Sequence, residues 1–252
     1  MSTVKPLVFI SHITEEKEIA IAFKELIESS FLGMLDVFVS SDEDSIHMGQ
    51  KWLDRISNGL KTCAIEIVLC SPKSILRPWI NFEAGAGWVR DIPVIPLCHS
   101  GIEPAKLPMP LNLLQAAKAN EVSSLKLVFP VLAQAIGAKT PSIDFSNFVA
   151  KVAEFEVRYT FWDSCNAAFD QINNFNGSIV SALKNGNPIT MDLTETEINC
   201  LLRPIEFLAK SNILNLVRSG GVTVGSRGMT HGCSLTPLAE LSKVVRDPHF
   251  KF

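Results

Sequence analysis

Apolar residues in the first half of the chain occur in two patterns, short continuous runs and stretches with helical spacing. The runs at 7–12, 36–41 and 64–71 are rich in β-branched residues, which is typical of buried strands, and 92–98 is a fourth. Between the first two runs, 15–30 has apolar residues three and four positions apart, which predicts a helix with one buried stripe. Strands that alternate with helices indicate βαβ units around a parallel sheet.

The same spacing predicts further helices at 50–61, 74–88, 111–117 and 123–136. One charged residue, Glu66, interrupts the third strand run. We interpret it as an edge or surface residue without a functional role, because edge strands commonly carry charges.

Small polar residues stand where the strand runs end, namely Ser11-His12, Ser40-Ser41 and Ser71. In an open parallel sheet, ligands bind beyond the carboxyl ends of the strands. We therefore expect a site at this edge of the sheet.

The segment 74–88 places Trp79 and Glu83 four residues apart, so the two side chains share one helix face. A glutamate beside an indole on an otherwise apolar, glycine-flanked helix is poorly solvated. Such a residue is either held by a structural partner or kept for chemistry on a bound molecule.

Several motifs in order resemble those of Toll/interleukin-1 receptor (TIR) domains in their bacterial form. They are Phe9-Ile-Ser-His12, Val37-Phe-Val-Ser-Ser-Asp42, Ile46-x-x-Gly49-x-x-Trp52, Leu69-Cys-Ser-Pro72, Trp79-x-x-x-Glu83 and Val94-Ile-Pro-Leu-Cys98. The resemblance covers roughly residues 5–137. It implies an α/β fold with a flavodoxin-like parallel sheet.

The resemblance also implies an activity. Many TIR domains of this kind cleave NAD at the nicotinamide glycosidic bond, and they depend on the glutamate that matches Glu83. Cleavage of that bond develops positive charge on the ribose, which an ionised carboxylate stabilises. NAD would be a substrate and not a cofactor, because Gly85-Ala-Gly87 lies within a helix and does not form a phosphate loop after a strand.

The same resemblance assigns the residues that would bind the substrate. Trp79 and Trp52 match positions that line the substrate pocket, and Asp42 lies on the loop that follows the second strand. Ser11 and His12 match first-loop positions that approach the nucleotide. A neutral His12 departs from the basic residue that many relatives carry near there.

A different class of function is left open, because other TIR domains are noncatalytic scaffolds or adaptors that assemble through homotypic TIR contacts. Bacterial relatives with this layout often act in antiphage defence. They destroy NAD or convert it to a cyclic ADP-ribose signal once a partner reports infection. Glu83 favours the enzyme, since a scaffold needs no carboxylate beside an indole. Whether the product is linear or cyclic stays open.

Composition and charge limit the classes of molecule that the protein is expected to bind. The chain has 252 residues, 47% of them hydrophobic, and a formal net charge of −3, so it has no basic footprint for nucleic acid. We expect no signal peptide, and the sequence has no apolar run near the ~18 residues of a membrane span. We therefore expect a cytoplasmic protein with reduced cysteines. Its five histidines never pair at metal-ligand spacing, so no metal site is expected.

The domain organisation predicted from these patterns is a TIR domain at 1–137, a linker at 137–142 and a mainly helical domain at 144–252. Within the helical stretch 144–184, one set of apolar residues follows the four-three spacing of a coiled-coil seam. These seam residues are Phe148, Val152, Phe155, Tyr159 and Trp162. They would pack either on their own domain or on a partner helix, and the second alternative predicts a homo-oligomer that supports activity.

The end of the chain is loosely similar to a winged-helix domain. Thr194 and Glu197 have capping-box spacing before a helix, 213–224 and the segment after 232 suggest a two-stranded wing, and Ser234 is expected to open a closing helix. The charges of this region are nearly balanced, which is unlike a phosphate-binding surface. We expect it to bind a protein partner or to dimerise.

Overall fold

The computed structural model describes residues 5–40, 52–226 and 228–252, with only the backbone described for residues 52, 53, 219 and 220. The chain forms two compact units, Met1–Tyr159 and Thr160–Phe252. Of the described residues, no helix is both long enough and apolar enough to cross a membrane.

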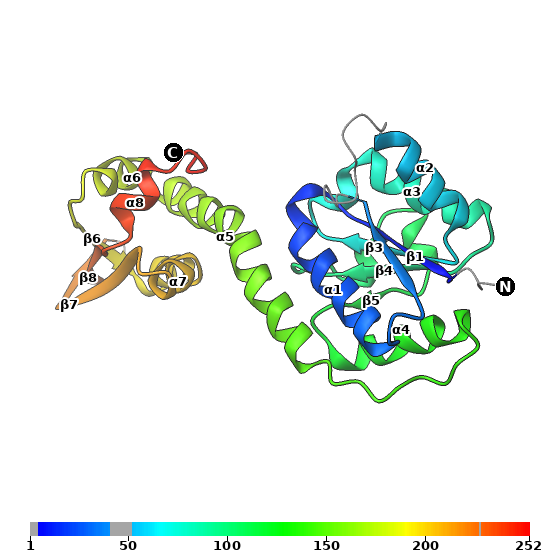
Figure 1. Ribbon diagram of the computed structural model, residues 1–252. Helices are drawn as coiled ribbons and strands as arrows, with labels where there is room; N and C mark the ends of the chain where they lie inside the picture. The colour runs from blue at the N-terminus through cyan, green and yellow to red at the C-terminus, as the bar shows by residue number, and fades with distance from the viewer. Residues whose placement is uncertain (1–4, 41–51, 227) are drawn as a thin grey trace. The chain divides into compact units, whose positions relative to one another are not determined.

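The first unit contains a five-stranded parallel sheet in the order β2-β1-β3-β4-β5, which confirms the predicted flavodoxin-like fold (Figure 1). The strands are β1 (Leu7–Ser11), β2 (Asp36–Val39), β3 (Ile65–Cys70), β4 (Val94–Cys98) and β5 (Ala117–Lys118). The helices that cover the sheet are α1 (Lys17–Ser30), α2 (Trp52–Thr62), α3 (Pro78–Val89) and α4 (Val122–Ala135).

Two hydrophobic layers enclose the sheet. One packs α1 and α4 on one face, with Phe23 and Phe129 fully buried. The other face packs against α2 through Ile56 and against α3 through Ile80. The central strand β3 is buried at every position, as expected for a parallel strand with helices on both sides.

The location of Glu66 corrects the sequence-based interpretation. It lies in β3, in the middle of the sheet, and is fully buried. A charged residue in an apolar run suggests an edge strand, but strand order is decided by pairing between distant segments. Here β1 and β4 pair with β3 on its two sides.

The predicted helix at 111–117 is also wrong. A 3₁₀ turn occupies Leu111–Leu113, and Ala117–Lys118 pairs with β4 as the edge strand β5. Pro108 and Pro110 precede this segment, and proline has no N–H group to extend a helical hydrogen-bond ladder.

The long helix α5 (Ser146–Phe175) belongs partly to the first unit. Phe148, Val152 and Phe155 are buried in the same core as α1 and α4, and Tyr159 packs against it. This part of the predicted seam is therefore covered by its own domain and not by a partner helix. An apolar stripe on a helix indicates that another element covers it, but it does not indicate whether that element belongs to the same domain or to a partner. The division between the two compact units falls at Tyr159, within α5.

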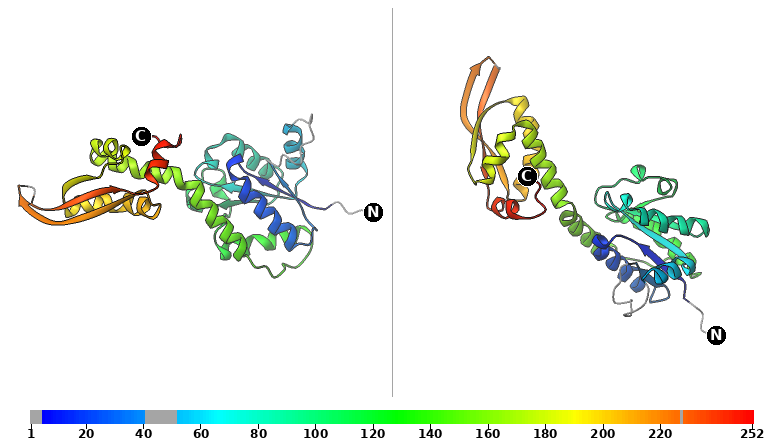
Figure 2. Two further views of the ribbon diagram at one scale, coloured as in Figure 1. Left: turned by 60° about the vertical axis from the view of Figure 1, so that its left-hand side comes forward. Right: turned by 90° about the horizontal axis from the view of Figure 1, so that it is seen from above.

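The second unit combines helices with a three-stranded antiparallel sheet in the order β6-β8-β7. Its elements after α5 are α6 (Gly177–Lys184), β6 (Ile189–Thr194), α7 (Glu195–Lys210), β7 (Leu214–Gly225), β8 (Gly228–Pro237) and α8 (Leu241–Arg246). The capping box between Thr194 and Glu197 is confirmed at the start of α7. Figure 2 shows β7 and β8 as an extended hairpin.

The winged-helix resemblance is not confirmed. The residues predicted to open the closing helix, Ser234 to Pro237, instead form the end of β8, and α8 begins only at Leu241. Proline at the end of a strand is tolerated because it costs no ladder bond there, so the Thr-Pro pair does not by itself start a helix.

Candidate active site

The helix α3 carries the proposed catalytic residue on its inner face. It begins with Pro78 at the first helical position, where a missing N–H costs nothing. Its buried positions are Ile80, Glu83, Ala84 and Gly87, which follow helical spacing. The sequence thus turns Glu83 toward the sheet, and the half-exposed Trp79 stands one turn earlier.

Glu83 is fully buried and is held by the end of β1. The Ser11 hydroxyl donates to Glu83 Oε2 at 2.5 Å, whereas no described residue hydrogen-bonds Oε1. Burial raises the pKa of Glu83 to about 7, although hydrogen bonds from Ser11 and Trp79 oppose the rise. Near neutral pH this carboxyl is therefore present in both protonation states.

Trp79, one turn before Glu83 on α3, reaches the surface. Its ring stacks on Phe82 with 5.1 Å between centroids, and its side chain is 36% exposed. Both aromatics line an apolar groove of about 770 Å³ between α2 and α3. The other apolar residues of this groove are Ile56, Leu60, Ala86 and Val89.

A second buried carboxyl lies beneath α3, and sequence reasoning missed it. A Cβ atom on Gly87 would lie 2.2 Å from Glu66 Oε2 and 2.6 Å from a methyl carbon of Val94, so only glycine fits this close approach. Burial, with a further contribution from the charge of Glu83, raises the pKa of Glu66 to about 8. The backbone N–H of Gly87 acts against this rise, but among the described residues neither oxygen of Glu66 has a hydrogen bond of good geometry.

The other residues predicted to bind the substrate are His12, Trp52 and Asp42. His12 is buried next to Ser11, and its Nδ1 lies 2.6 Å from the carbonyl oxygen of Ile13. Burial is the main reason that its pKa lies below the ordinary value, so a neutral ring predominates at pH 7. A neutral ring supplies no charge for a phosphate. Trp52 begins α2, but its side chain lies outside the described residues, as does Asp42.

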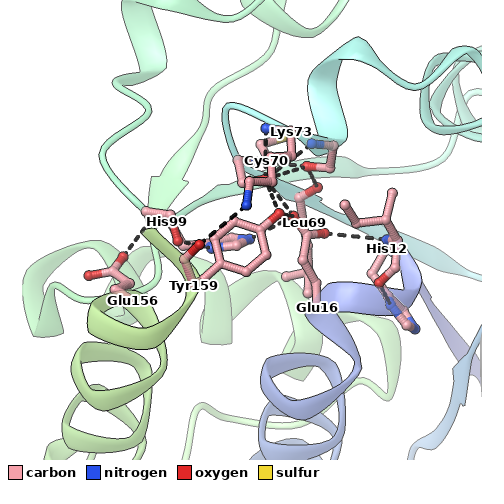
Figure 3. Close-up of polar contacts among 12 residues, drawn as sticks. His12, Glu16, Leu69, Cys70, Lys73, His99, Glu156 and Tyr159 are labelled. Carbon is pink, nitrogen blue, oxygen red and sulfur yellow. Dashed lines mark hydrogen bonds and ion pairs between the residues drawn. The ribbon is translucent and has the colours of Figure 1, made fainter. Parts of the chain in front are cut away.

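A polar network occupies the same edge of the sheet (Figure 3). Its centre is Glu16, which ends a 3₁₀ turn at Thr14–Glu16 just after β1 and is fully buried. The Ser71 hydroxyl, at the end of β3, donates to Glu16 Oε1 at 2.6 Å. His99, at the end of β4, places Nε2 3.2 Å from that oxygen, the distance of an ion pair, without the geometry of a hydrogen bond. Ser71 was expected at this edge, whereas Glu16 gave no sequence signal.

These side chains do not resemble a metal centre. In the described ranges 5–40, 52–226 and 228–252, no group of three or more histidine, cysteine or acidic side chains could hold a metal ion. The five cysteines at 63, 70, 98, 165 and 233 are buried free thiols, and Cys200 is an exposed one.

Comparison with known proteins identifies the first unit. Residues 8–127 match the family model described as the TIR domain, and this part of the chain is a TIR domain. No curated protein gives a match.

Among solved structures, the chain is similar to the TIR domains of the activated Roq1 resistosome directly recognizing the pathogen effector XopQ. The identity is 13%, with 62% of this chain and 83% of the other covered, at a TM-score of 0.33.

Proposed function

We propose that this protein cleaves the glycosidic bond between nicotinamide and ribose in NAD, with Glu83 as the catalytic carboxylate. The observation that carries the proposal is the state of that carboxyl. It is buried on the inner face of α3, and its pKa is about 7. Ser11 and Trp79 hydrogen-bond it, while Oε1 has no partner of good geometry among the described residues. TIR domains include enzymes of this kind.

Cleavage of this bond requires little proton transfer by the protein. As the glycosidic bond breaks, its electron pair moves to the pyridinium nitrogen, and nicotinamide leaves as a neutral molecule. The ribose acquires oxocarbenium character, which an ionised Glu83 stabilises electrostatically. Attack by water yields linear ADP-ribose and a proton, while attack by another atom of the same molecule yields a cyclic product. Ser11 orients the carboxylate, and Trp79 offers an aromatic wall for the substrate.

NAD must reach Glu83 before cleavage, and Glu83 is buried. With the carboxyl fully buried, no ribose contacts it, so cleavage requires neighbouring residues to move when NAD binds or when copies of the protein assemble. We therefore expect specific activity to increase with protein concentration. In bacterial antiphage defence, such an activity would remain low until a partner signals infection.

The alternative function is a noncatalytic TIR scaffold. The burial of Glu83 also favours the scaffold. So do the exposed side chains of Phe82 and Val89 on α3, which line the apolar groove. In this case, Glu83 would be a structural group and the groove a contact surface.

Product analysis separates the two functions. The full chain, at several concentrations, is incubated with NAD, and nicotinamide release is followed by chromatography. Glu83→Gln should reduce turnover to less than about a hundredth, since a lost stabilising group in a transition state costs about 3 kcal/mol. Glu25→Gln changes an exposed glutamate that pairs with Lys151 and should leave turnover unchanged. Absence of cleavage at every concentration would leave the scaffold as the function.

A further inference from the structure

The carboxylate of Glu16 closes the turn that follows Ser11, the last residue of β1. Its Oε2 accepts the backbone N–H of Ile13 at 3.3 Å, and the N–H of Glu16 donates to the Ile13 carbonyl at 2.9 Å. Ser11 stands two residues before Ile13, at the end of β1. The turn that this carboxylate closes therefore begins directly after the residue that bonds Glu83.

The other oxygen of the same carboxylate reaches the long helix α5. Tyr159 Oη donates to Glu16 Oε1 at 3.3 Å and lies 3.0 Å from Ser71 Oγ (Figure 3). Burial acts to raise the pKa of Glu16, but the contacts with His99, Ser71 and the Ile13 backbone outweigh it, and the pKa lies below its ordinary value. The carboxylate that accepts the Tyr159 hydroxyl is thus ionised at neutral pH.

Other contacts hold the ring and backbone of Tyr159 in place. Lys73 Nζ lies 4.5 Å from the centre of its ring and donates to its backbone oxygen at 3.3 Å. Phe155 stacks on the ring at 5.0 Å. One turn before Tyr159, the Glu156 carboxylate accepts the backbone N–H of Ser100 at 2.6 Å, just beyond β4. These contacts make this turn of α5 a rigid support for Glu16.

We propose that Tyr159, acting through Glu16, is a positioning residue for the Ser11–Glu83 pair. The route consists of hydrogen bonds and a short stretch of backbone. The Tyr159 hydroxyl bonds Glu16, and Glu16 bonds the N–H of Ile13. Residues 11–13 then connect this turn to the hydroxyl that donates to Glu83. This inference rests on the proposed function and adds its regulation. Since α5 continues as one helix to Phe175, a partner that shifts this helix would change the aim of Ser11 and so the activity.

The kinetic test uses the full chain with Tyr159→Phe. This change removes the hydroxyl and keeps the ring, so the contacts with Phe155 and Lys73 remain. Loss of the hydroxyl, which contacts both Glu16 and Ser71, predicts a two- to tenfold lower kcat with little change in KM for NAD. The matched control is Arg158→Gln, which breaks an exposed pair between α5 and Glu18 at the start of α1 and should leave kcat unchanged. Equal kcat in wild type and Tyr159→Phe would overturn the proposal.

A spectroscopic test is independent of turnover. The chain contains a single tyrosine, so tyrosine labelled with ¹³C at Cζ gives one resonance, from Tyr159. We expect Ser11→Ala and Glu83→Gln to shift this resonance, and Lys243→Gln, which changes an exposed pair in the second unit, to leave it in place. A resonance unmoved by both site variants overturns the positioning role. A shifted resonance in a protein that never cleaves NAD keeps the contact route and rejects the enzyme.

Discussion

The Ser11 hydroxyl and the Glu83 carboxylate, 72 residues apart in the chain, are joined by a hydrogen bond of 2.5 Å in the interior of the TIR domain. The bond links the end of β1 to the inner face of α3. It also stabilises the ionised form of Glu83 against burial, which is the form that can stabilise a ribosyl cation.

Removal of this bond should shift the pH dependence of the reaction. In Ser11→Ala, the carboxylate loses a donor, so the pKa of Glu83 rises from about 7 and a smaller fraction is ionised at neutral pH. We expect a two- to tenfold loss of NAD cleavage at pH 7, recovered in part as the pH is raised. Rates measured between pH 6 and 9 test this. Ser29→Ala, on the exposed end of α1, serves as the control.

Glu66 should make the protein less stable in alkaline solution. Its pKa in the folded chain, about 8, lies above the unfolded value of about 4.5, so the neutral form favours folding. This contribution is complete below pH 4.5 and is lost as the pH rises through 8, with an upper limit of roughly 5 kcal/mol. Glu66→Gln should therefore lose less thermal stability than wild type between pH 6 and 9. Parallel melting curves for the two proteins would contradict a buried, neutral Glu66.

Two glycines of α3 provide a matched pair. Gly87→Ala places a Cβ 2.2 Å from Glu66 Oε2, and Val94 blocks a shift to the side, so we expect a loss of about 1–3 kcal/mol. Gly85→Ala meets no atom within 4 Å and should stabilise the helix by about 0.5–1 kcal/mol. Denaturant unfolding of both variants gives the comparison. Equal free energies of unfolding would mean that the close packing of Glu66 under α3 is wrong.

Trp79 should contribute to binding more than to stability. Its ring is partly exposed and stacked on Phe82, so Trp79→Ala should cost less than the roughly 3–5 kcal/mol typical of a buried indole. We expect a higher KM for NAD and a smaller loss of kcat than in Glu83→Gln. Calorimetry beside kinetics separates these effects. If KM is unchanged, the wall of the substrate pocket lies elsewhere.

Local patterns predicted much of the first unit. The alternation of apolar runs and helical spacing located the four longer strands of the parallel sheet, and the spacing of Trp79 and Glu83 placed both side chains on one helix. These features depend on residues near each other in sequence, where the periods of strands and helices are decisive. The capping box of Thr194 and Glu197 was found for the same reason.

The errors have a common cause. Glu66 was assigned to an edge because its neighbours along the strand say nothing about which strands lie beside it. The apolar stripe of α5 was compatible with a partner helix because its spacing is the same whether another chain or its own domain covers it. Strand order and helix packing depend on segments far apart in the sequence.

The sequence by itself determined the four longer strands and the main helices of the TIR domain, and that Trp79 and Glu83 share one face of a helix. Only the tertiary structure decided that Ser11 bonds Glu83 and that Glu66 is buried beneath α3. It also decided that Tyr159 bonds Glu16, 143 residues away in the chain. The physical reason is that short-range backbone geometry sets each local element. The partner of a buried polar group is chosen only when distant elements pack and every such group must be satisfied or bear the cost of burial.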